Sequence, residues 1–226
     1  MEINSREEWE ELLRKAEAND VDAQNEAAFI YEHGLAINGL QIVDVDKTSA
    51  RFWIKKAYEN GSVDAMTNLA HYLTDRDSKD RDIELGMSLY ETAMNLGDDY
   101  AAYCLGLEYR NKQNFEKAFE LYNKAHRKED FYKELTIAMC YYHGVGVNQD
   151  RQKAFEIFKS LKFPDMSQYE VDEANYMIGR IYLEGEVVEK DLDKAREYLE
   201  LADSDGDHRS AQEILYIIGR RKLIES

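Results

Sequence analysis

The chain has 226 residues, with one proline, 12 glycines and a formal net charge of −17 that comes from 46 acidic and 29 basic residues. So little proline argues against sandwiches and barrels of many short strands, which need more turn residues, and the composition favours helix. The negative charge argues against binding to nucleic acid or anionic lipid and steers cationic partners toward the protein, although carboxylates also keep an elongated protein soluble.

The N-terminal segment predicts a capping helix. Ser5 and Glu8 have the spacing of a capping box. Apolar residues follow at helical spacing and are expected to be buried: Trp9, Leu12, Leu13 and Ala16. The segment has neither a basic lead nor an apolar core, so we do not expect a signal peptide. No apolar run in the sequence approaches the roughly 18 residues of a membrane span, so we expect no membrane association.

From residue 20 onward, one pattern recurs five times. The pattern is Ala-x3-Leu-Gly-x2-Tyr, then an acidic residue about nine positions after the tyrosine, then x2-Lys-Ala-x2-aromatic-aromatic-x2-Ala, and the copies keep most of these positions. The copies start at residues 23, 65, 101, 133 and 174, and a half copy starts at 211; the intervals of 42, 36, 32, 41 and 37 residues indicate a basic unit of about 36. The unit varies mainly in the loop between its two helices, and Tyr31 to Asp46 spans 15 residues in the first copy. Such a period is typical of stacked helix pairs.

The residues of the pattern suit two packed helices. Small residues at positions 0 and 5 of the first helix let the second helix approach closely. Gly34, Gly144 and Gly185 lie where a first helix must end, and each suits a left-handed residue there. The residues that precede the second helices predict N-caps, which accept backbone N–H groups and complement the helix dipole: Asp46, Asp82, Asn114, Asp150 and Asp191.

This pattern resembles the Sel-one-like repeat, a relative of the tetratricopeptide repeat, over residues 20 to about 219. The fourth copy matches Tyr-x2-Gly-x-Gly-Val completely, with Tyr141, Gly144, Gly146 and Val147. The resemblance implies an all-α fold, a right-handed α/α superhelical solenoid of about five helix pairs with capping helices. We expect a single domain over residues 1–226, with an N-terminal capping helix at 1–19, repeats at 20–208 and a C-terminal capping helix at 209–226.

The sequence offers few residues for catalysis or metal binding. The histidines have no spacing typical of metal ligands: His33, His71, His126, His143 and His208. Cys104 and Cys140 fall in separate apolar stretches, which predicts buried, reduced thiols and a cytoplasmic protein. Gly144-Val145-Gly146 lacks the Gly-Lys-Ser/Thr that follows in a phosphate-binding loop. We therefore expect no enzyme, metal or cofactor, although the carboxylates are too numerous for paired-acid catalysis to be tested from the sequence.

The resemblance to tetratricopeptide arrays also implies that positions −1, 2, 3, 6, 9 and 10 of each first helix face a concave groove. In the first two copies these residues include Asp22, Asn25, Glu26, Glu32, His33, Asp64, Asn68, His71 and Asp75. In the later copies they include Tyr100, Tyr103, Arg110, Tyr132, Met139, Tyr142, His143, Tyr176, Met177 and Arg180. The groove is expected to run from an acidic half to a centre lined by tyrosine and methionine, and tyrosine is enriched at interfaces. The alternative is that several of these tyrosines pack between neighbouring repeats.

These features predict a non-catalytic protein-binding solenoid with a basic protein partner and with no nucleic-acid or membrane ligand. The most specific hypothesis is an acidic inhibitor or immunity-type protein that sequesters a basic effector, such as a nuclease toxin, in its concave groove. The alternative is a general adaptor or assembly scaffold for a signalling or secretion complex. The sequence does not decide between a monomer and an oligomer.

Overall fold

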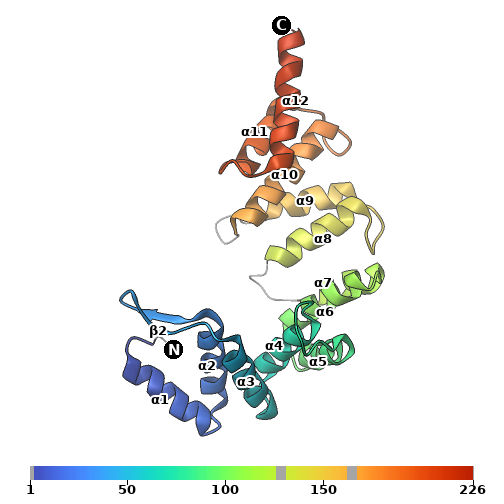
Figure 1. Ribbon diagram of the computed structural model, residues 1–226. Helices are drawn as coiled ribbons and strands as arrows, with labels where there is room; N and C mark the ends of the chain where they lie inside the picture. The colour runs from blue at the N-terminus through green and yellow to red at the C-terminus, as the bar shows by residue number, and fades with distance from the viewer. Residues whose placement is uncertain (1–2, 126–130, 162–166, 226) are drawn as a thin grey trace. The chain divides into compact units, whose positions relative to one another are not determined.

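The computed structural model describes residues 3–125, 131–161 and 167–225, which form twelve helices and one short β-hairpin (Figure 1). The chain divides into two compact units, Met1–Glu108 and Tyr109–Ser226, and the boundary falls inside α6 (Asp99–Asn111). Five helix pairs follow one another along the chain. The predicted all-α solenoid of repeated helix pairs is therefore confirmed, apart from the hairpin.

In the first unit, each helix from α1 to α5 packs on the next. These helices are α1 (Arg6–Glu17), α2 (Val21–His33), α3 (Lys47–Glu59), α4 (Val63–Thr74) and α5 (Ile83–Asn95). The side chain of Ser5 caps α1, as predicted, and Trp9 is buried. Gln24 is also buried, and both of its polar side-chain atoms are hydrogen-bonded. Its Nε2 donates to the carbonyl oxygen of Ala16 at 2.9 Å, and its Oε1 accepts from Nδ2 of Asn60 at 3.0 Å. These polar contacts join α1, α2 and the end of α3.

In the second unit, each helix from α7 to α12 packs on the next. These helices are α7 (Phe115–Lys124), α8 (Phe131–His143), α9 (Arg151–Ser160), α10 (Gln168–Glu184), α11 (Leu192–Ala202) and α12 (Arg209–Glu225). The large fully buried side chains of α8 to α11 are Tyr142, Phe158, Met177, Ile178, Ile181 and Leu199. α12 packs through Ala211 and Ile218 against Leu199 and Ala202. That α12 serves as a cap for the repeats stays a prediction.

All five predicted N-caps are confirmed. The side-chain oxygen of each accepts N–H groups from the first turn of the following helix. The backbone N–H of the same residue donates to the carbonyl oxygen at position 8 of the first helix, at 2.7–3.1 Å: Asp46 to Tyr31, Asp82 to Leu73, Asn114 to Tyr109, Asp150 to Tyr141 and Asp191 to Tyr182. Loops of different length are therefore closed by the same backbone hydrogen bond.

The ends of the first helices largely follow the predicted chemistry. Gly34, Gly144 and Gly185 all have positive φ, at 78°, 71° and 73°. Gly185 has the left-handed helical conformation that was predicted, with ψ of 19°. Gly34 does not, because its ψ of 168° is extended. The first helix of the fifth repeat, α10, begins at Gln168, before the start of the repeat at residue 174. Ser167 and Glu170 form a complete capping box at its N-terminus, which was not identified from the sequence.

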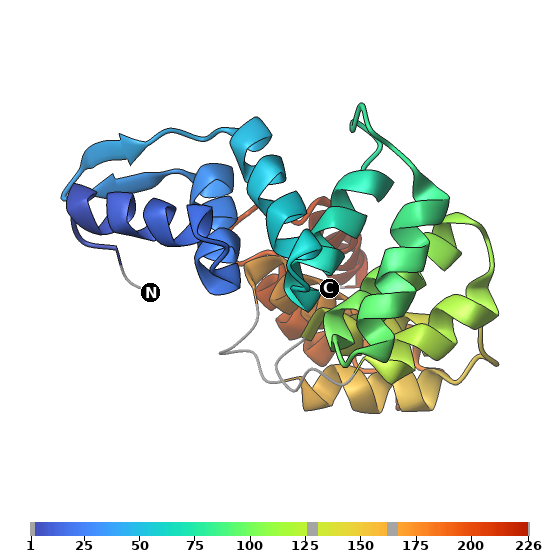
Figure 2. The same ribbon diagram turned by 90° about the horizontal axis from the view of Figure 1, so that it is seen from below.

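The long loop between α2 and α3, of which the sequence indicated only the length, contains secondary structure of its own. It contains two antiparallel strands, β1 (Leu35–Ile37) and β2 (Leu40–Val43), which project from the end of α2 (Figure 2). The turn residues Asn38 and Gly39 have φ of 52° and 78°. Positive φ at both central residues is the requirement of a type I′ turn, and Asn-Gly satisfies it best. The Asn-Gly pair between two apolar runs was the signal that could have predicted this hairpin.

Small residues mark the place where two helices of the same unit cross, as predicted. One lies at position 5 of the first helix and its counterpart lies four residues after the N-cap: Ala28 and Ala50, Ala70 and Gly86, Ala138 and Ala154, Gly179 and Ala195. All eight are buried. A Cβ added at Gly86 would lie 3.1 Å from the carbonyl oxygen of Ala70, and one at Gly179 would lie 3.1 Å from that of Ala195. The helices are thus close enough that one backbone contacts the other.

Candidate functional site

The predicted partner-binding residues differ widely in exposure. Nine are exposed: Asp22, His33, Asp64, Asn68, His71, Asp75, Tyr100, Arg110 and His143. Seven are half-buried: Asn25, Glu26, Glu32, Tyr103, Met139, Tyr176 and Arg180. Tyr142 and Met177 are buried, and the side chain of Tyr132 lies outside the described residues. The first unit carries the acidic members of the set, and the second unit carries the two buried ones.

Position 2 of the first helices contacts the start of the next repeat. In α2, Nδ2 of Asn25 donates to Oγ of Ser62, the N-cap of α4, at 3.0 Å. In α4, the hydroxyl of Thr67 donates to Asp98 at 2.5 Å, and Asp98 accepts N–H groups from the first turn of α6. In the second unit, the rings of Tyr176 and His208 lie 4.7 Å apart, just before α12. Asn25 and Tyr176 therefore fix the register between repeats, in agreement with the alternative considered for the tyrosines.

Tyr142 and Met177 do not lie on a surface, because each is only 1% exposed and belongs to the core of the second unit. The hydroxyl of Tyr142 donates to Oε2 of Glu184 at 2.7 Å. Burial and this hydrogen bond raise the pKa of Tyr142 to about 12. Both residues are accordingly removed from the candidate surface.

Charged side chains cover Tyr142 from the neighbouring elements. Arg151 of α9 lies over its ring, with Cζ 4.9 Å from the ring centre, and Arg180 of α10 lies 5.7 Å from it. Both guanidinium groups also pair with Glu184, Arg151 at 3.3 Å and Arg180 at 2.8 Å. Arg151 forms a further ion pair with Glu186. Arg180 is therefore half-exposed, but its guanidinium group already interacts with Glu184 and Tyr142.

Two exposed carboxylates repeat on the first unit. Asp22 lies in the first turn of α2 and Asp64 lies in the first turn of α4, and both occupy position −1 of their repeats. Within the residues that the structure describes, neither carboxylate takes part in an ion pair or a side-chain hydrogen bond. Each benefits only from the positive end of its own helix dipole. Asp22 and Asp64 are consequently free to pair with cations of another molecule.

The second unit has an apolar pocket of about 160 Å³ between α7 and α8. Its lining consists of Arg110, Phe115, Ala118, Tyr122, Thr136, Met139, Cys140, His143 and Val145. Three of these belong to the predicted set, namely Arg110, Met139 and His143. Cys140 is a free, buried cysteine, as predicted; burial raises the pKa of its thiol, and the charge of Arg110 partly opposes that rise. The sequence analysis placed the three residues in a groove but did not indicate a pocket.

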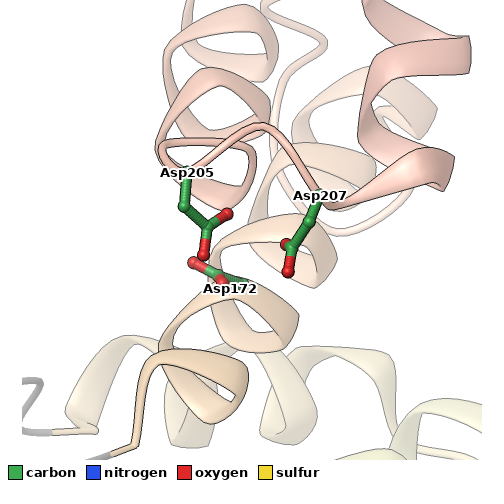
Figure 3. A group of neighbouring side chains, drawn as sticks. All are labelled: Asp172, Asp205 and Asp207. Carbon is green, nitrogen blue, oxygen red and sulfur yellow. The ribbon is translucent and has the colours of Figure 1, made fainter.

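Three carboxylates meet between α10 and the loop before α12 (Figure 3). Oxygen atoms of Asp172, Asp205 and Asp207 lie within 4.8 Å of one another. Burial raises the pKa of Asp172, and the hydrogen bond and charge of Asp205 raise the pKa of Asp207. Carboxylates of this kind suit Ca²⁺ or Mg²⁺, although Ca²⁺ takes 6–8 oxygen ligands and one oxygen from each carboxylate supplies only part of that number. The sequence analysis missed the group because its members come from distant parts of the chain.

The architecture and the repeated N-cap and crossing residues define an α/α repeat protein. The Sel1 repeat matches residues 21–62, 63–98, 93–129, 137–160 and 172–207, and the chain belongs to the Sel1 repeat family. Proteins with this fold generally bind other proteins and typically act as non-catalytic scaffolds. In the described part of the chain, no helix is both long enough and apolar enough to span a membrane.

The chain is similar to several proteins over most of its length. It is 27% identical to the Sel1-repeat-containing protein YjcO of Escherichia coli K12 over 214 residues, which cover 90% of this chain and 86% of YjcO. Its fold is similar to that of c5321, a protective antigen of uropathogenic E. coli with an SLR fold, at a TM-score of 0.73 and 24% identity. The match covers 93% of this chain but only 44% of c5321. A Sel1 repeat protein from Oxalobacter formigenes gives a TM-score of 0.65 at 20% identity, over 85% of this chain and 76% of that protein.

Proposed function

We propose that the chain is a non-catalytic protein that captures one basic protein partner, an effector such as a nuclease toxin, and keeps it inactive. The observation that carries the proposal is the pair Asp22 and Asp64, exposed at equivalent positions of α2 and α4 and without an ion pair among the described residues. The net charge of −17 adds a long-range field that accelerates encounter with a cationic protein and weakens with salt. The two free, buried cysteines suit a reducing compartment such as the cytoplasm.

Capture of a basic nuclease would inhibit it without any catalytic step. A nuclease binds the phosphates of its substrate through cationic side chains. An acidic protein that occupies those side chains excludes the substrate by competition, so binding and inhibition follow from the same contact. This mechanism requires only an acidic surface of fixed shape, which a stack of helix pairs provides.

Affinity capture tests the proposal. The tagged full-length chain is incubated with extract of its source cells at low and at physiological salt, and retained proteins are identified by mass analysis. We expect one stoichiometric partner with a basic isoelectric point, retained more strongly at low salt. If that partner is a nuclease, its activity should fall to zero at one equivalent of the chain. An acidic partner, or a nuclease that stays fully active in the complex, would contradict the proposal.

The second candidate function is a general adaptor or assembly scaffold for a signalling or secretion complex. It is favoured by the difference between the two units, since the acidic residues lie on the first and the apolar pocket lies on the second. Surfaces of such different chemistry suit two different partners. Several partners of different charge in the same capture would support the adaptor over the inhibitor.

A further inference from the structure

The pocket between α7 and α8 has the size of a single side chain. Its volume of about 160 Å³ is close to the roughly 150 Å³ of an apolar cavity that binds benzene. Phe115, Met139 and Val145 supply apolar walls, and Phe115 and Val145 are both partly open to solvent, at 39% and 37%. One aromatic ring or branched aliphatic side chain can therefore enter from solvent and fill it.

The walls of the pocket are held in place by close backbone packing. Gly146 follows Val145, has φ of 69° and lies against the start of α7. A Cβ at Gly146 would overlap the carbonyl oxygen of Phe115. The rings of Phe119 and Tyr141 also pack edge to face, with centroids 5.3 Å apart. A pocket with such fixed walls loses little conformational entropy when it is filled.

The charge of the pocket lining is opposite in sign to that of the whole protein. The lining contains Arg110 and His143 but no carboxylate, in a chain with 46 acidic and 29 basic residues. Arg110 is exposed, and its charge reaches the Cys140 thiol in the pocket wall. An occupant that places a carboxylate beside its apolar group can pair with the guanidinium of Arg110.

We propose that this pocket takes a peptide segment of a protein partner, with one aromatic or branched aliphatic side chain seated between Phe115 and Met139 and an adjacent carboxylate paired with Arg110. The proposal rests on the proposed function, in that it assigns an anchor to the captured protein. A partner that is basic overall meets the first unit through its cations and the second unit through this acidic, apolar segment. A second copy of this chain is disfavoured as the occupant, because two molecules of net charge −17 repel each other.

The test uses two small probes in place of the partner. N-acetyl-L-phenylalanine carries a benzyl group and a free carboxylate, and its carboxamide has the same shape without the charge. The full-length chain is labelled at its methionine methyl groups, and Met139→Leu assigns the Met139 resonance among the seven methionines. We expect both probes to shift this resonance saturably, with dissociation constants on the order of 1 mM for the acid. The acid should bind about fivefold more tightly than the amide.

A matched pair of variants separates the charge from the apolar contact. Arg110→Gln should weaken the acid to the affinity of the amide and leave the amide unchanged. Arg209→Gln removes another exposed arginine of the same unit, and the fivefold difference should remain. High salt should reduce the affinity difference between the acid and the amide in the unaltered chain, as Arg110→Gln does. This measurement tests the charge contact even if the variant fails to fold.

Three outcomes would overturn the proposal. These are no saturable shift of Met139 with either probe, equal affinity for the two probes, or a dimer of the free chain that Arg110→Gln dissociates. The last outcome would make a second copy the occupant. Because the probes replace the partner, a failure here leaves the capture experiment unaffected, and a failure to capture a basic protein leaves the probe result unaffected.

Discussion

The second and fifth repeats build the same helix crossing from opposite sides. In the second repeat, the first helix contributes Ala70 and the second helix contributes Gly86. In the fifth repeat, the first helix contributes Gly179 and the second helix contributes Ala195. In both, a Cβ in place of the glycine hydrogen would lie 3.1 Å from the carbonyl oxygen of the facing alanine. The close approach is therefore a property of the pair, and either helix can provide the glycine.

This comparison explains why a repeat pattern tolerates exceptions. Glycine inside a helix costs roughly 0.5–1 kcal/mol relative to alanine, so a second glycine at the crossing would weaken the helices without need. A second alanine in these two repeats would force the backbones apart. The first and fourth repeats have two alanines at the equivalent positions, which shows that the required spacing is local to each pair.

The largest effect is expected from Gly179→Ala. The new Cβ would lie 2.9 Å from Cγ of Leu199, which is fully buried and has no room to move. Overpacking of this kind typically costs 1–3 kcal/mol and outweighs the gain in helix propensity. We expect the free energy of unfolding to fall by about 2 kcal/mol in urea titrations followed by circular dichroism. Hydrogen exchange should accelerate most in α10 and α11, and an unchanged stability would mean that the crossing is looser than the structure indicates.

The next largest effect is expected when Gly179 and Ala195 exchange places. Ala195→Gly in the Gly179→Ala background recreates the arrangement of the second repeat. We expect the double variant to be more stable than the sum of the two single changes predicts, by about 1 kcal/mol, because residues in contact couple. A double-mutant cycle measures this coupling directly. Strict additivity would show that the glycine is required at position 179 itself.

Gly219→Ala is the matched control and should have the opposite sign. Gly219 also lies in a helix of the second unit, but nothing lies within 4 Å of a Cβ placed there. Only the helix propensity changes, so the variant should gain about 0.5–1 kcal/mol. The same urea titration measures it. A loss of stability would show that the end of α12 makes contacts that the described residues do not reveal.

The smallest effect is expected from Asp205→Asn in the carboxylate group before α12. The folded-state pKa values of Asp172 and Asp207 are raised, so the native state binds protons more tightly than the unfolded chain. Their contribution to stability is therefore complete below pH of about 4 and is lost as the pH rises through the folded-state values. Removal of the Asp205 charge should raise the melting temperature at pH 7 and leave it nearly unchanged below pH 4.

The control for this prediction is Glu189→Gln, which removes an exposed carboxylate of the same unit. It should have no comparable pH dependence. The melting curves are recorded with a chelator and again with Ca²⁺, so that any cation bound by the three carboxylates is detected. Equal pH profiles for Asp205→Asn and the unaltered chain would contradict the account of this group.

The sequence predicted the features that depend on a few neighbouring residues. An N-cap requires one side-chain oxygen and the N–H groups of the next turn, so Asp150 and Asp191 could be recognised from sequence alone. The hairpin was equally local and could have been predicted from Asn38-Gly39. The hairpin was missed because the extra length of this loop was interpreted only as an insertion between two helices.

The candidate surface was less predictable because exposure depends on the next repeat. Position 9 holds the exposed Arg110 in the third repeat and the buried Tyr142 in the fourth. Tyr142 is covered because Arg151 and Glu184 pack on it from α9 and α10. No pattern within one repeat contains this information. The pocket and the carboxylate group likewise arise from segments that meet only in the folded chain.

The central claim is that the acidic positions of the first unit meet a basic partner, and the association rate of the captured complex tests it most directly. Asp22→Lys with Asp64→Lys is compared with Glu10→Lys with Glu17→Lys, two exposed positions of α1. Both double variants change the net charge equally, so only position distinguishes them. The account predicts association about tenfold slower at low salt for the first variant, less than about threefold slower for the second, and unchanged dissociation for both. Equal slowing by the two variants, or none, would contradict the claim.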